Sequence, residues 1–203
     1  MAGPLADWQI RERMTLPDGD PKRLSITPFA EATKEPGKIS HGLSSYGYDL
    51  RLSNQFARYA KSTVSVHRGD QVITEEEAID PKTAAERMWD LTANSLVLPP
   101  NGFILGMSVE RFVIPEDVIA IVTTKSTYAR VGICLNMTPL ESGWQGTVTI
   151  EIANLSQLPV RIHPGEGIGQ VIFYEGSAPC LVPYNKKPHA MYQNQTGVTA
   201  ARV

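Results

Sequence analysis

Residues 147–152 read Thr147-Val148-Thr149-Ile150-Glu151-Ile152, an unbroken alternation of polar and apolar side chains. Successive side chains of a β-strand point to opposite faces, so the polar residues of this stretch share one face and the branched aliphatic residues share the other. A β-branched composition also favours the extended backbone. The stretch therefore predicts a strand with its aliphatic face in a core.

Similar short apolar or alternating runs lie on both sides of this stretch, separated by glycine and proline. They are Tyr48–Leu52, Ser95–Leu98, Phe103–Val109, Asp117–Thr123, Leu158–Ile162 and Gly169–Tyr174. Many short strands between turns are typical of a sandwich or barrel. We also expect two helices, at Asp7–Met14 and at Lys82–Leu91, where Asp80 suits the cap and Pro81 the first turn. The sequence predicts a mainly β, single-domain chain with a few short helices.

Composition excludes several classes of protein. The 203 residues are 42% hydrophobic and 20% charged, with a formal net charge of −2. A disordered chain would be less apolar, and a general nucleic-acid binder would carry a large cationic surplus. No apolar run approaches the length of a membrane span, and the first residues lack the pattern of a signal peptide. We therefore expect a cytoplasmic protein that binds neither nucleic acid nor membrane.

Metal-binding side chains are few and scattered. The two cysteines, Cys134 and Cys180, lie far apart, and the four histidines do not cluster. Structural zinc usually needs four Cys or His ligands and catalytic zinc three protein ligands. We expect no protein-bound metal, zinc included.

Glu151 is the first candidate for chemistry. A glutamate in the middle of a β-branched strand is a poor structural choice unless its carboxylate meets water or a partner. Beside the hydroxyls of Thr147 and Thr149 it could serve as a general base. An ordinary solvent-facing strand fits the same pattern, and periodicity alone leaves both interpretations open.

The segment 123–132 is the second candidate. Lys125, Ser126, Thr127 and Arg130 follow an apolar run, and either hydroxyl could cap a short helix beside the two cations. Such a helix start can bind phosphate through its free amides. A capped surface turn is the simpler interpretation of this segment alone.

Two further segments carry alternatives. Glu141, in the turn before the strand, could bind a sugar hydroxyl or be a solvated turn residue. Residues 184–203 are polar and short of apolar anchors, which fits either a mobile arm or a lid over bound ligand.

Taken together, these segments resemble the dCTP deaminase family of the dUTPase-like superfamily. The resemblance spans roughly residues 40–203 in order and spacing. It rests on Ser44-Ser45-Tyr46-Gly47-Tyr48-Asp49, Lys125-Ser126-Thr127-Tyr128-Ala129-Arg130, Thr138-Pro139-Leu140-Glu141, Gly143-Trp144-Gln145-Gly146, Thr149-Ile150-Glu151, Gly167-Ile168-Gly169-Gln170 and Tyr192-Gln193-Asn194-Gln195-Thr196-Gly197-Val198-Thr199.

The resemblance implies a dUTPase-like distorted β-barrel or sandwich that assembles as a homotrimer with active sites between subunits. It implies conversion of dCTP to dUTP and ammonia, which supplies dUTP for dUMP and dTTP synthesis, and feedback inhibition by dTTP. Mg²⁺ would enter bound to the triphosphate. The H-x-E and P-C-x-x-C segments of zinc deaminases are absent, so zinc is not expected.

The resemblance also implies roles for individual residues. Glu151 would activate water for attack at C4 of cytosine, in a base pocket lined by Thr149 and Ile150. The triphosphate grip would consist of Lys125, Ser126, Thr127, Tyr128, Ala129 and Arg130. Gln170, Tyr184 and Gln195 would complete the site, the last two in a C-terminal lid at about 184–203.

Two features of the sequence leave alternatives open. Met191 stands where many relatives have a lysine near the phosphates, and Lys186 or Lys187 could replace it. The chemistry could also continue from dUTP to dUMP in a bifunctional deaminase and diphosphatase, or the chain could be a non-catalytic deoxynucleotide-binding homologue. The presence of Glu151 favours deamination over dUTP hydrolysis alone and over a non-catalytic homologue, and it leaves the bifunctional reaction open.

Overall fold

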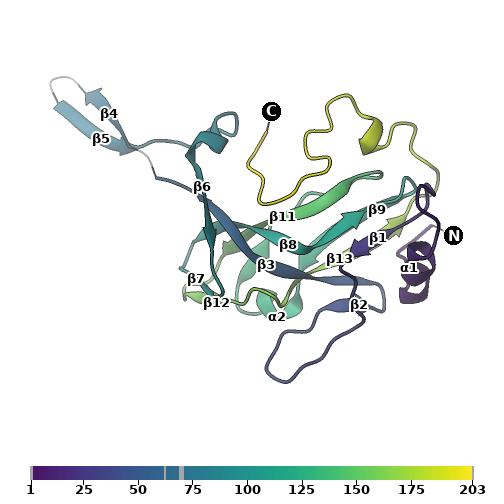
Figure 1. The fold of residues 1–203 in the computed structure, drawn as a ribbon. Helices are drawn as coiled ribbons and strands as arrows, with labels where there is room; N and C mark the ends of the chain where they lie inside the picture. The colour runs from purple at the N-terminus through teal and green to yellow at the C-terminus, as the bar shows by residue number, and fades with distance from the viewer. Residues whose placement is uncertain (1, 62, 69–70, 203) are drawn as a thin grey trace.

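The computed structural model describes residues 2–61, 63–68 and 71–202, with the backbone alone for 63–68 and 71–76. Within these residues a large antiparallel sheet follows the order β10-β11-β8-β3-β13-β9, with three short strands paired at its sides (Figure 1). Its strands are β1 (Ser25–Thr27), β2 (Gly42–Ser44), β3 (Gly47–Tyr59), β6 (Met88–Thr92), β8 (Phe103–Val113), β9 (Val118–Thr124), β10 (Ile133–Leu135), β11 (Gln145–Asn154) and β13 (Gly167–Glu175).

The two ends of this sheet lie against each other. The amide of Leu135 on β10 donates to Thr124 Oγ1 on β9 at 2.8 Å, and the two strands are in contact. The sheet therefore curves almost into a closed barrel. A separate pair, β7 (Leu96–Leu98) with β12 (Val160–Ile162), packs beside it. The prediction of a mainly β chain with a few short helices is confirmed.

Strand β11 confirms the prediction made from residues 147–152 and extends beyond it at both ends. It pairs with β8 on one side and β10 on the other. Its even-numbered residues, Val148, Ile150 and Ile152 among them, are at most 2% exposed, whereas the odd-numbered residues remain half-buried. The two-residue periodicity of the sequence thus separates a core face from a face available to ligand.

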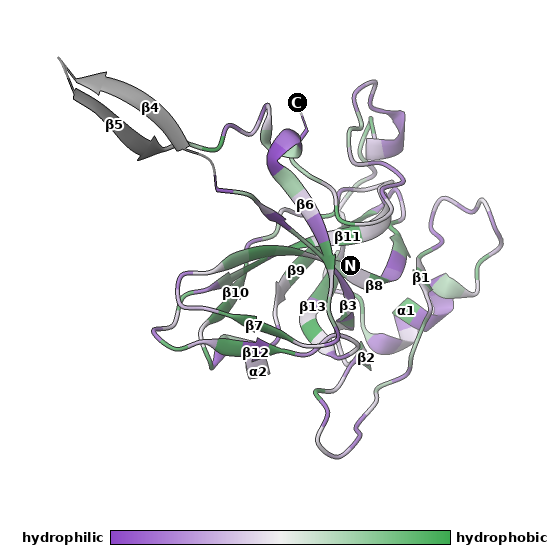
Figure 2. Ribbon diagram, turned by 60° about the vertical axis from the view of Figure 1, so that its left-hand side comes forward, coloured by the Kyte–Doolittle hydropathy of each residue, from purple (hydrophilic) through white to green (hydrophobic). Residues whose placement is uncertain are grey.

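Aromatic rings fill the middle of the core. Phe112 lies between Tyr48 and Phe173, with ring centroids 6.3 and 6.5 Å away. These rings come from β8, β3 and β13, which are successive neighbours in the sheet, and all three are fully buried. In Figure 2 the strands of the barrel carry green, hydrophobic stretches.

The predicted N-terminal helix is confirmed as α1 (Asp7–Met14), which buries Ile10. Arg13, in its last turn, donates to both carboxylate oxygens of Asp117 at 2.7 and 3.0 Å and to Glu175 at 2.7 Å. A bidentate arginine pair of this kind gives geometric specificity. It fixes α1 against the ends of β9 and β13.

The helix predicted at Lys82–Leu91 is wrong. One 3₁₀ turn, η1 (Ala84–Arg87), is followed directly by strand β6, which pairs with β3 from Tyr59↔Met88 to Gln55↔Thr92. The Arg58 guanidinium lies 3.9 Å from the centre of the Trp89 ring. A ten-residue helix is marginal by itself, and pairing with a neighbouring strand outweighs its propensity.

The hairpin of β4 (Thr63–Arg68) and β5 (Gln71–Glu76) extends away from the barrel in Figure 1. This hairpin is not among the strands predicted from the sequence. None of the helices in the described part of the chain is long and apolar enough to cross a membrane.

Candidate functional site

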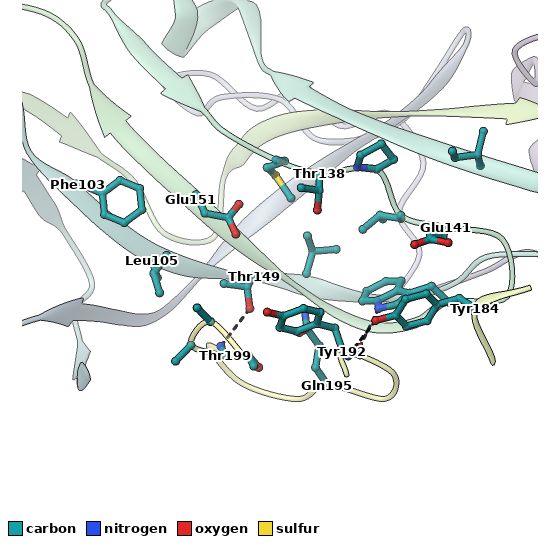
Figure 3. A pocket seen from close by; sticks show the side chains of 18 of the residues that line it. Phe103, Leu105, Thr138, Glu141, Thr149, Glu151, Tyr184, Tyr192, Gln195 and Thr199 are labelled. Atoms are coloured by element: carbon teal, nitrogen blue, oxygen red, sulfur yellow. Dashed lines mark hydrogen bonds between the residues drawn. The ribbon is translucent and has the colours of Figure 1, made fainter. Parts of the chain in front are cut away.

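A cavity of about 870 Å³ opens between β8, β11, the loop 137–141 and the C-terminal segment. Figure 3 shows side chains from all four pointing into it. Of the predicted site residues, it gathers Thr149, Glu151, Tyr184 and Gln195. Residues separated by up to 46 positions in the sequence thus share one cavity, of a size that suits a small-molecule ligand.

Glu151 lies on the half-buried face of β11, opposite Leu105 of β8 in the strand register. In Figure 3 its carboxylate points into the cavity beside Thr149, with Phe103 and Leu105 on the other side. Burial raises the pKa of this carboxyl, and a bond from its own backbone amide offsets the rise only in part. A carboxyl whose pKa moves toward neutrality is suited to exchange protons with a ligand.

The neighbouring threonines are bonded to the C-terminal segment. The Thr199 amide donates to Thr149 Oγ1 at 3.1 Å. The Gln195 side-chain amide donates to the Thr147 carbonyl at 2.7 Å, and the Thr147 amide donates back to the Gln195 carbonyl at 3.0 Å. The C-terminal segment therefore forms one wall of the cavity by pairing with β11.

The base of this wall is anchored by aromatic residues. Trp144 Nε1 donates to the Tyr192 carbonyl at 2.9 Å, and the Tyr192 amide donates to the Tyr184 hydroxyl at 3.1 Å. Tyr184 belongs to the 3₁₀ turn η2 (Tyr184–Lys186). A chain anchored at Tyr184 and Tyr192 brings Gln195 and Thr199 to the cavity.

Two predicted site residues have side chains in the core instead. Ile150 is fully buried on the other face of β11, so only its backbone is near the cavity. Tyr128 is 3% exposed, and its hydroxyl accepts the His163 amide at 2.9 Å. Burial raises the pKa of Tyr128.

The predicted phosphate segment is separate from this cavity within one chain. The residues 125–130 form the short helix α2 (Ser126–Ala129) and its flanks, and none of them lines the cavity. Lys125, not Ser126 or Thr127, occupies the N-cap position, and no side chain caps the helix. Ser126, Thr127, Ala129 and Arg130 are exposed.

The remaining predicted polar residues are paired with other side chains of the same chain. Lys125 forms an ion pair with Asp49 of β3, and Gln170 on β13 donates to Ser44 Oγ at 3.1 Å. Lys186 and Lys187, the candidates to replace a lysine at Met191, pair with Glu116 and Glu141 respectively. Of these two carboxylates, Glu141 lines the cavity.

Sequence reasoning missed several cavity residues. Phe103, Thr138, Tyr192 and Thr199 line it, although Thr138, Tyr192 and Thr199 belong to the quoted motifs. Phe103 precedes Leu105 by two positions on β8 and therefore shares its face. That this face lies beside Glu151 follows only from the register of β8 against β11. Across the described residues, no group of three or more His, Cys, Asp or Glu side chains could hold a metal ion.

Known proteins resemble the chain over most of its length. The family model described as dCTP deaminase-like matches residues 5–176. The dCTP deaminase of Acidobacterium capsulatum is 42% identical over 179 residues, which cover 88% of this chain and 91% of that protein. The dCTP deaminase of Chloroflexus aggregans is 44% identical over 199 residues, which cover 98% and 97%.

A solved structure supports the fold. The 2'-deoxycytidine 5'-triphosphate deaminase from Agrobacterium tumefaciens superposes with a TM-score of 0.56 at 21% identity, over 86% of this chain. This chain spans 48% of that protein, about half its length. On the strength of the family model and the two relatives, the chain belongs to the dCTP deaminase-like family.

Proposed function

We propose that the protein deaminates dCTP to dUTP and ammonia, with Glu151 as the general base. The observation that carries the proposal is Glu151 itself. Its carboxyl is half-buried in a cavity of about 870 Å³, has a raised pKa and lies beside a threonine hydroxyl. The names of the relatives, dCTP deaminase in each case, agree with this function.

Water adds across the N3–C4 double bond of the cytosine ring before ammonia leaves. The Glu151 carboxylate takes one proton from water as the oxygen attacks C4, and it delivers that proton to N3. It then carries the hydroxyl proton of the C4 adduct to the amino group. The C4–N bond breaks, ammonia leaves and the C4 carbonyl of uracil forms. One carboxyl thus serves as base and then as acid, a role for which a raised pKa is suited.

Thr149 and Ile150 border the base in this proposal, Ile150 through its backbone. Tyr184 and Gln195 belong to an arm, residues 184–203, that closes over the nucleotide. The bonds of this arm to Thr147 and Thr149 support its place at the site. Mg²⁺ enters as part of the Mg–dCTP substrate, and no proposed step uses a protein-bound metal or zinc.

The triphosphate grip comes from a second subunit in a homotrimer. The support is that residues 125–130 and Gln170 do not line the Glu151 cavity of their own chain. Ser126, Thr127 and Arg130 are exposed, as an intersubunit contact with ligand requires. The partner subunit's Arg130 would then face the phosphates of a nucleotide whose base lies against Glu151.

The test is ammonia release from dCTP and Mg²⁺ by the purified protein. We expect ammonia and dUTP in equal amounts. Formation of dUMP and pyrophosphate would replace this function with the bifunctional one, and binding without ammonia would leave a nucleotide-binding homologue. dTTP added to the same assay is expected to lower the rate.

A mixing experiment tests the shared site. Glu151→Gln and Arg130→Ala are each expected to be nearly inactive alone. Dissociating and reassociating the two together should restore activity, because some sites then receive both intact residues from different chains. Failure to restore it, with mixed trimers demonstrated by mass spectrometry, would place both residues in one chain's site.

A further inference from the structure

A row of polar side chains crosses three strands on one face of the sheet, outside the Glu151 cavity. Gln170 of β13 lies opposite Asp49 of β3 on one side and opposite Thr123 of β9 on the other. Residues opposite one another in adjacent strands point to the same face. The bond from Gln170 to Ser44 adds a fourth polar group to this row.

Lys125 follows the end of β9, and its partner Asp49 lies two strands away on β3. The backbone amide of Lys125 bonds to the Ile168 carbonyl at 3.0 Å, and its side chain crosses β13 at Gly167 to pair with Asp49 on β3. A Cβ on residue 167 would lie 2.1 Å from the Ser40 carbonyl oxygen and 3.3 Å from Lys125 Cδ. The glycine therefore allows the close approach of the Ser40 backbone, and the lysine side chain passes beside it on the way to its partner.

The pair is largely shielded from water. The Lys125 side chain is 12% exposed and that of Asp49 16%. Removing one partner of a buried ion pair leaves an uncompensated charge and is strongly unfavourable. A lysine without its partner would leave this position, since its long side chain has many alternative rotamers. Asp49 thus fixes where the ammonium is.

The ammonium still has capacity for a ligand. It carries three N–H donors, and the pair with Asp49 uses one of them. Arg130, one turn of α2 further on, is exposed, and no ion pair within the described part of the chain involves it. A fixed ammonium and an exposed guanidinium, carried by the residues at the two ends of α2, are suitable groups for binding a chain of phosphates.

We propose that Asp49 is a positioning residue, which acts through Lys125 to hold one cation of the triphosphate site in place. This inference rests on the proposed function, in which Lys125 contacts the triphosphate. The opposite role would be that the Asp49 carboxylate competes with phosphate for the ammonium. If Asp49 positions the ammonium, Asp49→Asn should weaken triphosphate binding. If Asp49 competes with phosphate, the same substitution should strengthen it.

The experiment is calorimetric titration of inorganic triphosphate into wild type, Asp49→Asn, Lys125→Met and the double variant. We expect each single variant to bind about tenfold more weakly or worse, and the double variant to bind no more weakly than Lys125→Met. Wild-type or tighter binding by Asp49→Asn would overturn the proposal, as would additive losses in the double variant. Absence of triphosphate binding by wild type would overturn it too.

Kinetics separate positioning from folding. Asp49→Asn should raise the KM for dCTP and leave kcat unchanged, whereas a folding defect would lower kcat through the amount of active protein. Asp49→Glu retains the charge and shifts it by one methylene, so its affinity should be at least threefold weaker than wild type but better than Asp49→Asn. Thermal melts establish which variants are folded. If Asp49→Asn is unfolded, the triphosphate affinity of Asp49→Glu tests the proposal instead. Wild-type affinity in Asp49→Glu would overturn it.

These titrations also separate this inference from the proposed function. Inorganic triphosphate has no base, so its binding does not depend on deamination. A wild type that binds triphosphate through Asp49 and Lys125 but releases no ammonia would refute the function alone.

Discussion

Replacing Glu151 by glutamine is the sharpest perturbation of the cavity. Glutamine retains the shape of the side chain and the contacts on the half-buried face of β11, but it cannot take a proton from water. General-base assistance contributes about 10²–10⁴-fold to a rate. At about 1.4 kcal/mol per tenfold, this is roughly 3–5 kcal/mol of activation free energy. We expect kcat to fall by that factor while KM for dCTP changes less than about threefold.

The pH dependence provides an independent readout. Burial raises the pKa of Glu151, so the acid limb of kcat/KM in the wild type should lie at higher pH than an exposed glutamate would give. The residual activity of Glu151→Gln should lack this limb. The assay is ammonia release with saturating and limiting dCTP between pH 4 and pH 9, with Glu12→Gln on the exposed side of α1 as the matched control.

Glu151→Gln should lose activity but gain stability against unfolding. A carboxyl whose folded pKa exceeds its unfolded pKa is most favourable to the fold below both values, and stability is lost as pH rises through the folded pKa. Glu151→Gln removes that loss, so the variant should be more stable than wild type at pH 8 and gain least at pH 4. Deamination by Glu151→Gln within tenfold of wild type would refute the assignment of Glu151 as the base.

Three further predictions concern the buried ion pair of Arg51 and Glu110, the aromatic core, and the Mg²⁺ that enters with the substrate. Arg51 Nε donates to Glu110 Oε1 at 2.6 Å, and Glu110 is fully buried, so Arg51→Met should cost about 3–5 kcal/mol in urea unfolding. Because burial raises the pKa of Glu110, the loss of stability in Arg51→Met should be larger at pH 8 than at pH 5. The double variant Arg51→Met/Glu110→Gln should recover part of this loss. No recovery would contradict the reasoning. Phe112→Ala, which empties the centre of the aromatic core, should cost about 3–5 kcal/mol by the same measurement, and a loss below about 1 kcal/mol would be inconsistent with that packing. Ammonia release should survive a zinc-selective chelator and stop with excess EDTA until Mg²⁺ is restored; loss of activity with the zinc chelator would contradict the proposed reaction.

Local patterns predicted much of the fold because the main strands are long enough to express their periodicity. Residues 147–152 are apolar on one face and polar on the other, and they form a strand with those two faces. The failure at residues 82–91 has the opposite cause. That segment has good helix formers, but β3 presents an unpaired edge to it, and strand pairing prevails over local propensity. Propensity cannot reveal an edge formed by residues about 30 positions earlier.

The candidate site divides in the same way. The family resemblance identified Glu151, Thr149, Tyr184 and Gln195, which the fold brings to one cavity. Its motifs gave no indication that Tyr128 and Ile150 direct their side chains into the core, because a motif states which residues occur together and not which way they point. Phe103 was missed for a related reason, since its place beside Glu151 depends on the register of β8 against β11.

The sequence by itself determined the β-rich class, the family resemblance and the chemical character of the site, because alternation and motif spacing are local properties of the chain. Only the tertiary structure decided which polar groups meet. Lys125 finds its partner in Asp49, 76 positions earlier, by crossing β13 at a glycine. Within one chain, the predicted phosphate segment and Glu151 lie at different places on the barrel. Such contacts depend on strand order and register, which arise from the packing of the whole core.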